Sequence, residues 1–293
     1  MSPKLPADNA ISIAEFLQHS KSQAVEGPSN AYQFAFMDHD FLASPETRGI
    51  RFQLELLKPE VAMKNLGVDH TITVFGSARC ISKEAAERAA KLAVTEEAIQ
   101  KNRIDLAHSE NYEAARSFGR LVAQYNLGQT EDSQKLRICT GGGPGIMEAA
   151  NRGASEMGDL TVGLNISLPK EQTHNPYITP ELCFRFHYFA LRKMHFLLRA
   201  RAIVAFAGGF GTMDELFEVL TLIQTRKINA FPVVLVNKAF WSSVINFQGF
   251  VDNGLIDKAD LALFHLVDTP EDAWKVIYDW YDLGNKTIEK RRD

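Results

Sequence analysis

From about residue 70 onward, short apolar runs alternate with longer stretches whose apolar residues recur at helical spacing. The runs have the length of β-strands and are rich in Val, Ile and Leu. Strands are therefore expected within residues 71–79, 135–145, 160–169, 201–209, 231–237 and 261–268. Helices are expected over residues 83–100, 112–126 and 146–158, and further helices are expected to begin near Ala190, Thr212, Trp241 and Glu271.

This alternation predicts an α/β fold. Strands that are apolar on both sides are typical of a parallel sheet with helices on both of its faces. We therefore expect a doubly wound, Rossmann-like, mostly parallel sheet over residues 68–293. Sheets of this kind bind ligands at the carboxyl ends of the strands, at the point where the strand order reverses.

The segment before the sheet, residues 1–67, is expected to be a partly helical extension. Ser44 is placed to cap a helix that has Pro45 in its first position. Apolar residues follow at helical spacing, and Pro59 is expected to end or kink this helix. We expect the extension to pack on the main domain or on another subunit.

Composition and charge exclude several classes of protein. The 293 residues carry a net charge of −4, which does not favour binding to nucleic acid or to a membrane surface. Three widely spaced cysteines indicate reduced thiols in a cytoplasmic protein, not a disulfide framework. The sequence contains neither HExxH nor a Cys/His cluster, so we expect no metal and no cofactor.

Three expected strands end in loops of a ligand-binding type: "FGSAR" (75–79), "TGGGPG" (140–145) and "AGGFGT" (207–212). In a parallel sheet these loops lie at the same edge. Glycine permits a close approach of the backbone, and a helix start offers free N–H groups to an anion. Arg79 adds a charged fork suited to phosphate or carboxylate. The hypothesis is a site for a phosphorylated ligand; the alternative is that the glycines only form tight strand–helix turns.

The standard nucleotide fingerprints are incomplete in these loops. Neither loop completes GxGxxG, because Glu148 and Asp214 stand where the third glycine would be. The sequence has no GxxxxGK[ST] motif and no GxSxG elbow. A P-loop nucleotide triphosphatase and a serine hydrolase are therefore disfavoured.

Glu215 follows the third loop and has two interpretations. Thr212 and Glu215 have the spacing of a capping box, in which Thr212 caps a helix and Glu215 bonds back to the Thr212 amide. The functional alternative is a carboxylate held beside the sugar of a bound nucleotide. The spacing alone does not separate the two.

Two segments, "CTGGGPGIMEAANRGA" (139–154) and "GGFGTMDELFE" (208–218), together resemble the LONELY GUY (LOG) family, whose signature is PGGxGTxxE. The resemblance covers roughly residues 70–270. Family members, often labelled lysine decarboxylases, hydrolyse the N-glycosidic bond of nucleoside 5'-monophosphates to a free base and ribose 5-phosphate. Their substrates include cytokinin ribotides and AMP-like monophosphates, and the members are oligomers built from dimers.

The resemblance implies roles for particular residues. Glu215 and Arg192 would be the catalytic pair, and Lys193 would follow the arginine as in the family. The remaining residues expected to contact the nucleotide or its phosphate are Gly76, Ser77, Arg79, Gly141, Gly142, Gly143, Gly145, Met147, Gly208, Gly209, Gly211 and Thr212. A plainer interpretation makes Arg192 an ion-pair partner at a helix start and Lys193 a solvated helix residue.

The sequence departs from the family pattern in two places. Ala207 replaces the signature proline, and the Met-His pair that precedes the arginine in plant-type members instead follows it, as Met194 and His195. The resemblance implies a nucleoside 5'-monophosphate as substrate and a homodimer or higher homo-oligomer. Three alternatives stay open: a nucleotide sensor without activity, a nicotinamide or flavin oxidoreductase, and a pyridoxal-phosphate decarboxylase with Lys193 as the Schiff-base lysine.

Overall fold

The computed structural model describes residues 30–168 and 173–288, and the first 29 residues of the expected extension lie outside the described residues. The chain forms two compact units, Met1–Arg51 and Phe52–Asp293. The division falls inside helix α3 (Arg48–Asn65), so this helix belongs with the sheet from Phe52 onward. The expected boundary after residue 67 stays a prediction.

The first unit contains short elements that are tied together by local hydrogen bonds. They are η1 (Asn30–Tyr32), α2 (His39–Ala43) and η2 (Pro45–Thr47). The Arg51 guanidinium donates to the backbone oxygens of Leu42 and Ser44, at 2.7 and 2.6 Å.

Two expectations for this part of the chain are met only in part. Ser44 is the N-cap of η2 and Pro45 is its first residue, but the Ser44 side chain forms no capping bond, and α3 begins at Arg48. Pro59 does not end α3, which continues to Asn65 with the proline ring buried, and a kink at Pro59 stays a prediction. Proline lacks the N–H that would bond to the preceding turn, and here apolar packing keeps the helix intact.

The second unit is built on a seven-stranded sheet in which every pair of neighbours is parallel, so the predicted fold class is confirmed. The strands are β1 (His70–Phe75), β2 (Leu136–Thr140), β3 (Thr161–Ile166), β4 (Cys183–Phe186), β5 (Ala200–Ala205), β6 (Val233–Val236) and β7 (His265–Val267). The sequence pattern missed β4. Its four residues lie at the edge of the sheet and are only partly buried, so they form no apolar run.

The strand order is β4-β3-β2-β1-β5-β6-β7, with β1 at the centre. The chain builds outward from β1 to β4 on one side and then returns to place β5 on the other side. Val74 pairs with Thr140 of β2 and with Val204 of β5. The order therefore reverses between β1 and β5, and the loops after these two strands meet at the switch point of the sheet.

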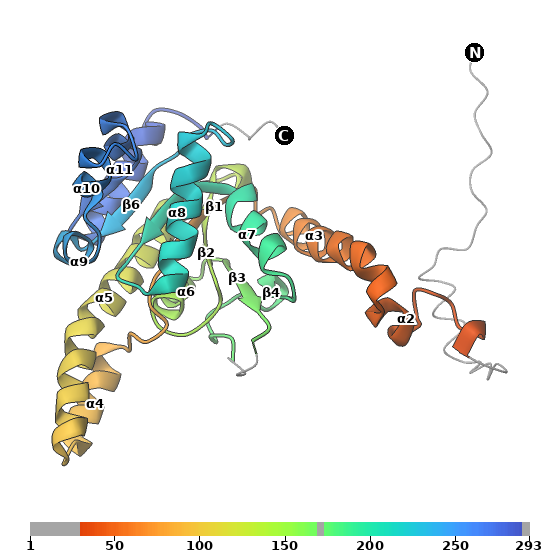
Figure 1. Cartoon of the computed structure of the whole chain (residues 1–293), viewed down its shortest axis with the longest axis horizontal. Helices are drawn as coiled ribbons and strands as arrows, with labels where there is room; N and C mark the ends of the chain where they lie inside the picture. Colours follow the sequence, from red (N-terminus) through yellow and green to blue (C-terminus); the bar gives the residue numbers. More distant parts are fainter. Residues whose placement is uncertain (1–29, 169–172, 289–293) are drawn as a thin grey trace. The chain divides into compact units, whose positions relative to one another are not determined.

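Two layers of helices cover the sheet (Figure 1). Helices α5, α6 and α11 share one apolar core with it, and α3, α7, α8 and α9 share the other. The helices after β1 are α4 (Lys83–Leu92), α5 (Glu96–Leu127), α6 (Ile146–Ser155), α7 (Phe189–Leu198), α8 (Phe210–Gln224), α9 (Lys238–Val244), α10 (Phe247–Asp252) and α11 (Pro270–Tyr281), and the 3-10 turns are η3 (Asp132–Gln134), η4 (Pro180–Leu182) and η5 (Lys258–Leu263).

The helices between β1 and β2 differ from the expected pair. The segment expected as one helix over 83–100 breaks after Leu92, because Thr95 adopts an extended conformation and caps α5 by accepting from the Ala98 amide. Helix α5 then runs without interruption to Leu127. Figure 1 shows α4 and the first part of α5 lying side by side beyond the sheet.

Helices α5 and α6 approach each other at two glycines. A Cβ atom on Gly119 would lie 2.3 Å from the Ala150 oxygen, and one on Gly153 would lie 1.9 Å from the Arg116 oxygen. Larger residues would therefore force the two backbones apart.

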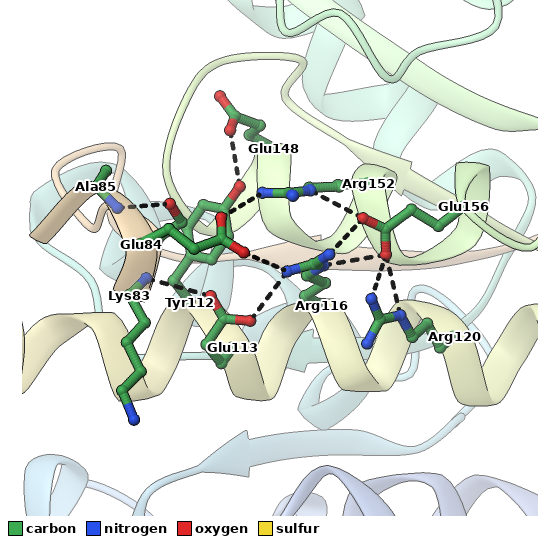
Figure 2. Close-up of polar contacts among 11 residues, drawn as sticks. Lys83, Glu84, Ala85, Tyr112, Glu113, Arg116, Arg120, Glu148, Arg152 and Glu156 are labelled. Atoms are coloured by element: carbon green, nitrogen blue, oxygen red, sulfur yellow. Dashed lines mark hydrogen bonds and ion pairs between the residues drawn. The ribbon is translucent and has the colours of Figure 1, made fainter. Parts of the chain in front are cut away.

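A network of ion pairs lies beside this crossing (Figure 2). Glu156 of α6 binds Arg116 and Arg120 of α5 and also Arg152, one turn earlier on α6. Burial raises the pKa of Glu156, but hydrogen bonds from the three arginines outweigh it and bring the pKa to about 2. Tyr112 extends the contacts between the helices by donating to Glu148 Oε1 at 2.7 Å.

We predict that Glu156→Gln lowers the free energy of unfolding at pH 7 by ~1–3 kcal/mol, measured by urea denaturation. A carboxyl whose pKa falls on folding stabilises the protein above its unfolded pKa. The contribution of Glu156 to the free energy of unfolding should therefore be complete above pH 4.5 and disappear as the pH falls toward about 2. Glu87→Gln, at an exposed position on α4, is the matched control. Equal losses of unfolding free energy in Glu156→Gln and Glu87→Gln would contradict a stabilising role for the ion pairs of Glu156.

Candidate nucleotide site at the switch point

A cleft of about 840 Å³ opens at the carboxyl ends of β1 and β5. All three glycine loops of the sequence reach it, as their position at one edge of a parallel sheet requires. The sequence-predicted residues that line it are Gly76, Ser77, Arg79, Gly141, Met147, Arg192, Gly208, Gly209, Gly211, Thr212 and Glu215. The cleft is of the size that holds small ligands and cofactors.

Four other predicted residues are not among the lining residues: Gly142, Gly143, Gly145 and Lys193. Gly142 and Gly145 have φ angles of +73° and +75°, a conformation that favours glycine. A Cβ atom at Gly145 would also lie 2.2 Å from the Ser77 oxygen, so this glycine lets the first two loops touch. The "GGGPG" loop thus shapes the wall of the cleft. Contact of these glycines with a ligand stays a prediction.

Helix α8 starts at the third loop, two residues earlier than expected. Its N-cap is Gly209, and no side chain of the described residues caps it. Thr212 is therefore inside the helix, and the predicted capping box is wrong. The buried Thr212 side chain instead packs against Gly208, where a Cβ atom would lie 2.1 Å from Thr212 Oγ1.

The glycines at this helix start leave its backbone open. A Cβ atom on Gly209 or Gly211 would meet nothing within 4 Å, although both residues line the cleft. The first turn of a helix has N–H groups without acceptors in the helix, and it carries the positive end of the helix dipole. This part of the cleft is suited to an anionic group.

The Arg192 side chain is fixed by backbone oxygens. Its Nε donates to the Leu164 oxygen at 2.7 Å, and its guanidinium lies 5.0 Å from the centre of the Phe196 ring. Gly141 makes room for it, because a Cβ atom there would lie 2.5 Å from Arg192 Nη2. Burial lowers the pKa of Arg192, and the neighbouring Glu215 carboxylate opposes this shift.

Lys193 contacts three carboxylates of α8. Its Nζ lies 2.8 Å from Asp214, 3.3 Å from Glu215 and 2.6 Å from Glu218. The interpretation of Lys193 as a solvated residue is wrong, since its side chain is only 18% exposed. Burial lowers the pKa of Lys193, but hydrogen bonds to Asp214 and Glu218 outweigh it and raise the pKa above its ordinary value. A Schiff base needs a neutral amine, so this environment disfavours the decarboxylase alternative.

The Glu215 carboxylate also lines the cleft. Its side chain is 12% exposed, and burial raises its pKa above the ordinary value of 4.5. The charges of Lys193 and Arg192 act in the opposite direction. A carboxylate with a raised pKa in a cleft is typical of an acid–base catalyst.

Several lining residues belong to no motif and were missed by the sequence interpretation. Most are apolar and come from α7, α8, α9 and the residue after α9: Phe189, Phe210, Met213, Phe217, Phe240, Val244 and Ile245. His108 of α5 also lines the cleft and belongs to no motif. The only sequence signal of the apolar lining residues is their spacing, which core packing also produces.

The part of the chain that the structure describes contains neither a metal-binding cluster nor a membrane-spanning helix. Within residues 30–168 and 173–288, no group of three or more His, Cys, Asp or Glu side chains is arranged to hold a metal ion. In the same part of the chain, the helices are too short or too polar to cross a bilayer.

The fold and the cleft thus define an α/β protein with an open helix start beside a largely buried carboxylate. A family model described as "Possible lysine decarboxylase" matches residues 147–277. The chain is 28% identical over 152 residues to the rice (Oryza sativa subsp. japonica) "Probable cytokinin riboside 5'-monophosphate phosphoribohydrolase LOG4", covering 50% of this chain and 64% of that protein. It is 25% identical over 174 residues to "Cytokinin riboside 5'-monophosphate phosphoribohydrolase LOG1" of Arabidopsis thaliana, covering 58% and 80%. Over this part of its length the chain is similar to the LOG family.

Solved structures are more distant. One is "the molybdenum cofactor binding protein from the phototrophic bacterium Rippkaea orientalis", with a TM-score of 0.44, 20% identity, and coverage of 72% of this chain and 97% of that chain. The α/β architecture described above rests on the strand pairing of this chain itself.

We predict that Lys193→Met raises the pKa of Glu215 further, because the variant removes a positive charge 3.3 Å from the carboxylate. Carbon-13 NMR titration of labelled glutamate, with the Glu215 signal assigned through Glu215→Gln, measures the change. Lys238→Met, at an exposed lysine of α9, is the control. A Glu215 titration curve that does not move in Lys193→Met would contradict the proposed coupling.

Proposed function

We propose that this protein hydrolyses the N-glycosidic bond of nucleoside 5'-monophosphates, releasing a free base and ribose 5-phosphate. The observation that carries the proposal is the buried Glu215 carboxylate, which lies in one cleft with Arg192 and the open glycine start of α8. Similarity to the LOG family supports it, since the matched relatives are named as phosphoribohydrolases of cytokinin riboside 5'-monophosphates.

The phosphate would bind at the start of α8. Gly209 and Gly211 present no side chain there, so phosphate oxygens can approach the backbone N–H groups directly. Arg79 lines the same cleft and supplies a positive charge. Binding energy from the phosphate would fix the ribose, although the phosphate is remote from the bond that breaks.

Glu215 would act on the sugar. Cleavage of a ribosyl bond passes through a transition state with oxocarbenium character, which a neighbouring carboxylate stabilises. The same carboxylate would orient and deprotonate the attacking water. Burial raises the pKa of Glu215, which brings its basicity nearer to the working pH.

Arg192 and Lys193 would have different tasks. Arg192 lines the cleft and would hold the ribose or phosphate, while its bonds to backbone oxygens keep the guanidinium in place. Lys193 lies behind Glu215, and its charge would help keep the Glu215 carboxylate ionised. The base would lie against the apolar wall, to which Phe189 and Phe240 belong.

Two alternatives remain for the same cleft. A nucleotide sensor would need the open helix start but not the buried Glu215 carboxylate beside Arg192. A dinucleotide oxidoreductase would need the third glycine of GxGxxG, and Glu148 and Asp214 stand at these positions. We further propose a cytoplasmic homodimer or higher homo-oligomer, following the family resemblance.

The product assay is the primary test. Purified metal-free protein is incubated with a panel of nucleoside 5'-monophosphates and the matching nucleosides, and released base is resolved by chromatography. We predict base from monophosphates only, and a rate at least about 100-fold lower in Glu215→Gln. Near-normal turnover in Glu215→Gln would remove Glu215 from the mechanism. Tight nucleotide binding without any released base would favour the sensor.

A second prediction concerns the helix start. Gly211→Ala should fold normally, because the added methyl group meets no protein atom within 4 Å. If a phosphate occupies the cleft at α8, the methyl group obstructs it, and KM for the monophosphate should rise about tenfold with little change in Tm. Gly49→Ala, also in a helix with open space around its Cβ position, is the control. An unchanged KM in Gly211→Ala would place the phosphate elsewhere.

A further inference from the structure

Helix α7, which carries both Arg192 and Lys193, supplies little of its own stabilisation. Its sequence, FALRKMHFLL, contains no acid to complement the helix dipole. Tyr188 occupies the N-cap position and forms no side-chain capping bond. The helix is only ten residues long, a length at which an isolated helix is marginal in water. Its position therefore depends on contacts from other elements.

Helix α3 provides such a contact at the N-terminus of α7. The Glu55 carboxylate accepts hydrogen bonds from the backbone N–H groups of His187 and Tyr188, at 2.9 and 3.2 Å. A carboxylate at this end satisfies unpaired donors and complements the positive end of the dipole. One turn earlier on α3, the Phe52 ring packs edge-on against Tyr188, with 4.3 Å between the ring centres.

The same helix also contacts the C-terminus of α7. Glu60 pairs with Arg199, the C-cap residue, and its carboxylate lies 3.5 Å from Nδ1 of the buried His195. The contact with His195 lowers the pKa of Glu60 most, and Arg199 lowers it further. Together they bring the pKa to about 2, although partial burial raises it. Arg199 Nε in turn donates to the Val68 oxygen at 2.9 Å, two residues before β1.

We infer that Glu55 and Glu60 of α3 are positioning residues that hold α7 at both ends and thereby set Arg192 at the cleft and Lys193 against α8. The hydrogen-bond and ion-pair partners of the two glutamates described above lie in or beside α7 and are not among the residues that line the cleft, so their effect on it passes through α7. Lys193 depends on this placement, because it reaches three carboxylates of α8 from the middle of α7. The catalytic consequence rests on the proposed function; the placement itself does not.

The test compares Glu55→Ala and Glu55→Gln with the unchanged protein. Gln53→Ala, at an exposed position of α3 two residues before Glu55, is the control. We expect backbone amides of α7 to exchange hydrogen at least about tenfold faster in Glu55→Ala, with other helices unchanged. The rate constant kcat should fall about tenfold or more, whereas KM changes less, because misplacement of a catalytic group acts mainly on the chemical step. Glu55→Gln keeps one acceptor oxygen and should restore part of both properties.

A readout without turnover separates this inference from the proposed function. The Glu215 carboxyl titration, followed by carbon-13 NMR, should move to higher pH in Glu55→Ala as Lys193 is displaced. If the unchanged protein cleaves no monophosphate, the proposed function fails, and this titration together with amide exchange still decides the inference. Unchanged exchange along α7 would overturn it. Faster exchange with an unmoved Glu215 titration and unchanged kcat would reduce Glu55 to a structural contact.

Glu60→Gln provides a second, independent variant at the other end of the helix. It removes the charge that pairs with Arg199 but keeps the volume of the side chain. We expect faster exchange toward the C-terminus of α7 and the same direction of change in the Glu215 titration. The same changes in amide exchange and in the Glu215 titration for the Glu55 and Glu60 variants would support the inference that both glutamates hold α7 in place. An effect of the Glu60 variant alone would exclude the role of Glu55.

Discussion

The contact of the Lys193 ammonium group with three carboxylates of α8 organises the centre of this molecule. Lys193 belongs to α7, and its partners Asp214, Glu215 and Glu218 belong to the helix that follows β5. One cation thus joins the helix that leads into β5 to the helix that leaves it. Because Lys193 and Glu215 are only 18% and 12% exposed, solvent screens this pair less than a surface salt bridge. The charge that joins the helices also determines how readily Glu215 ionises.

The chain topology brings this pair of helices to the cleft. The strand order reverses between β1 and β5, and the loops after these two strands line one open space, the cleft at the switch point. Glycine then removes side chains from the edges of that space, at Gly76 after β1 and at Gly208 and Gly209 after β5. Charged side chains reach this space from the helices that flank it, as Arg192 of α7 and Glu215 of α8 do.

The sequence predicted the sheet and the three loops because both depend on local patterns. In the sequence, buried parallel strands are apolar runs, and positions where the backbone closely approaches a neighbouring segment are occupied by glycine. The errors concern features that depend on distant contacts. Thr212 has the spacing of a cap, but the start of α8 at Gly209 places it inside the helix. Lys193 has the local sequence of a solvated residue, and its three partners are more than twenty positions away. Glu55, which caps α7, lies more than a hundred residues before it and belongs to no motif.

The central position of β1 has a consequence for the order in which the protein is synthesised. His70 pairs with Leu136 of β2, and Thr71 pairs with Ala200 of β5 on its other side. During translation the second edge of β1 therefore has no native neighbour until β5 emerges from the ribosome. An apolar strand with an open edge is prone to pair with other chains. Its fully buried residues in the finished sheet make β1 the segment that most needs protection, by a chaperone or by the early helices, while the nascent chain is incomplete.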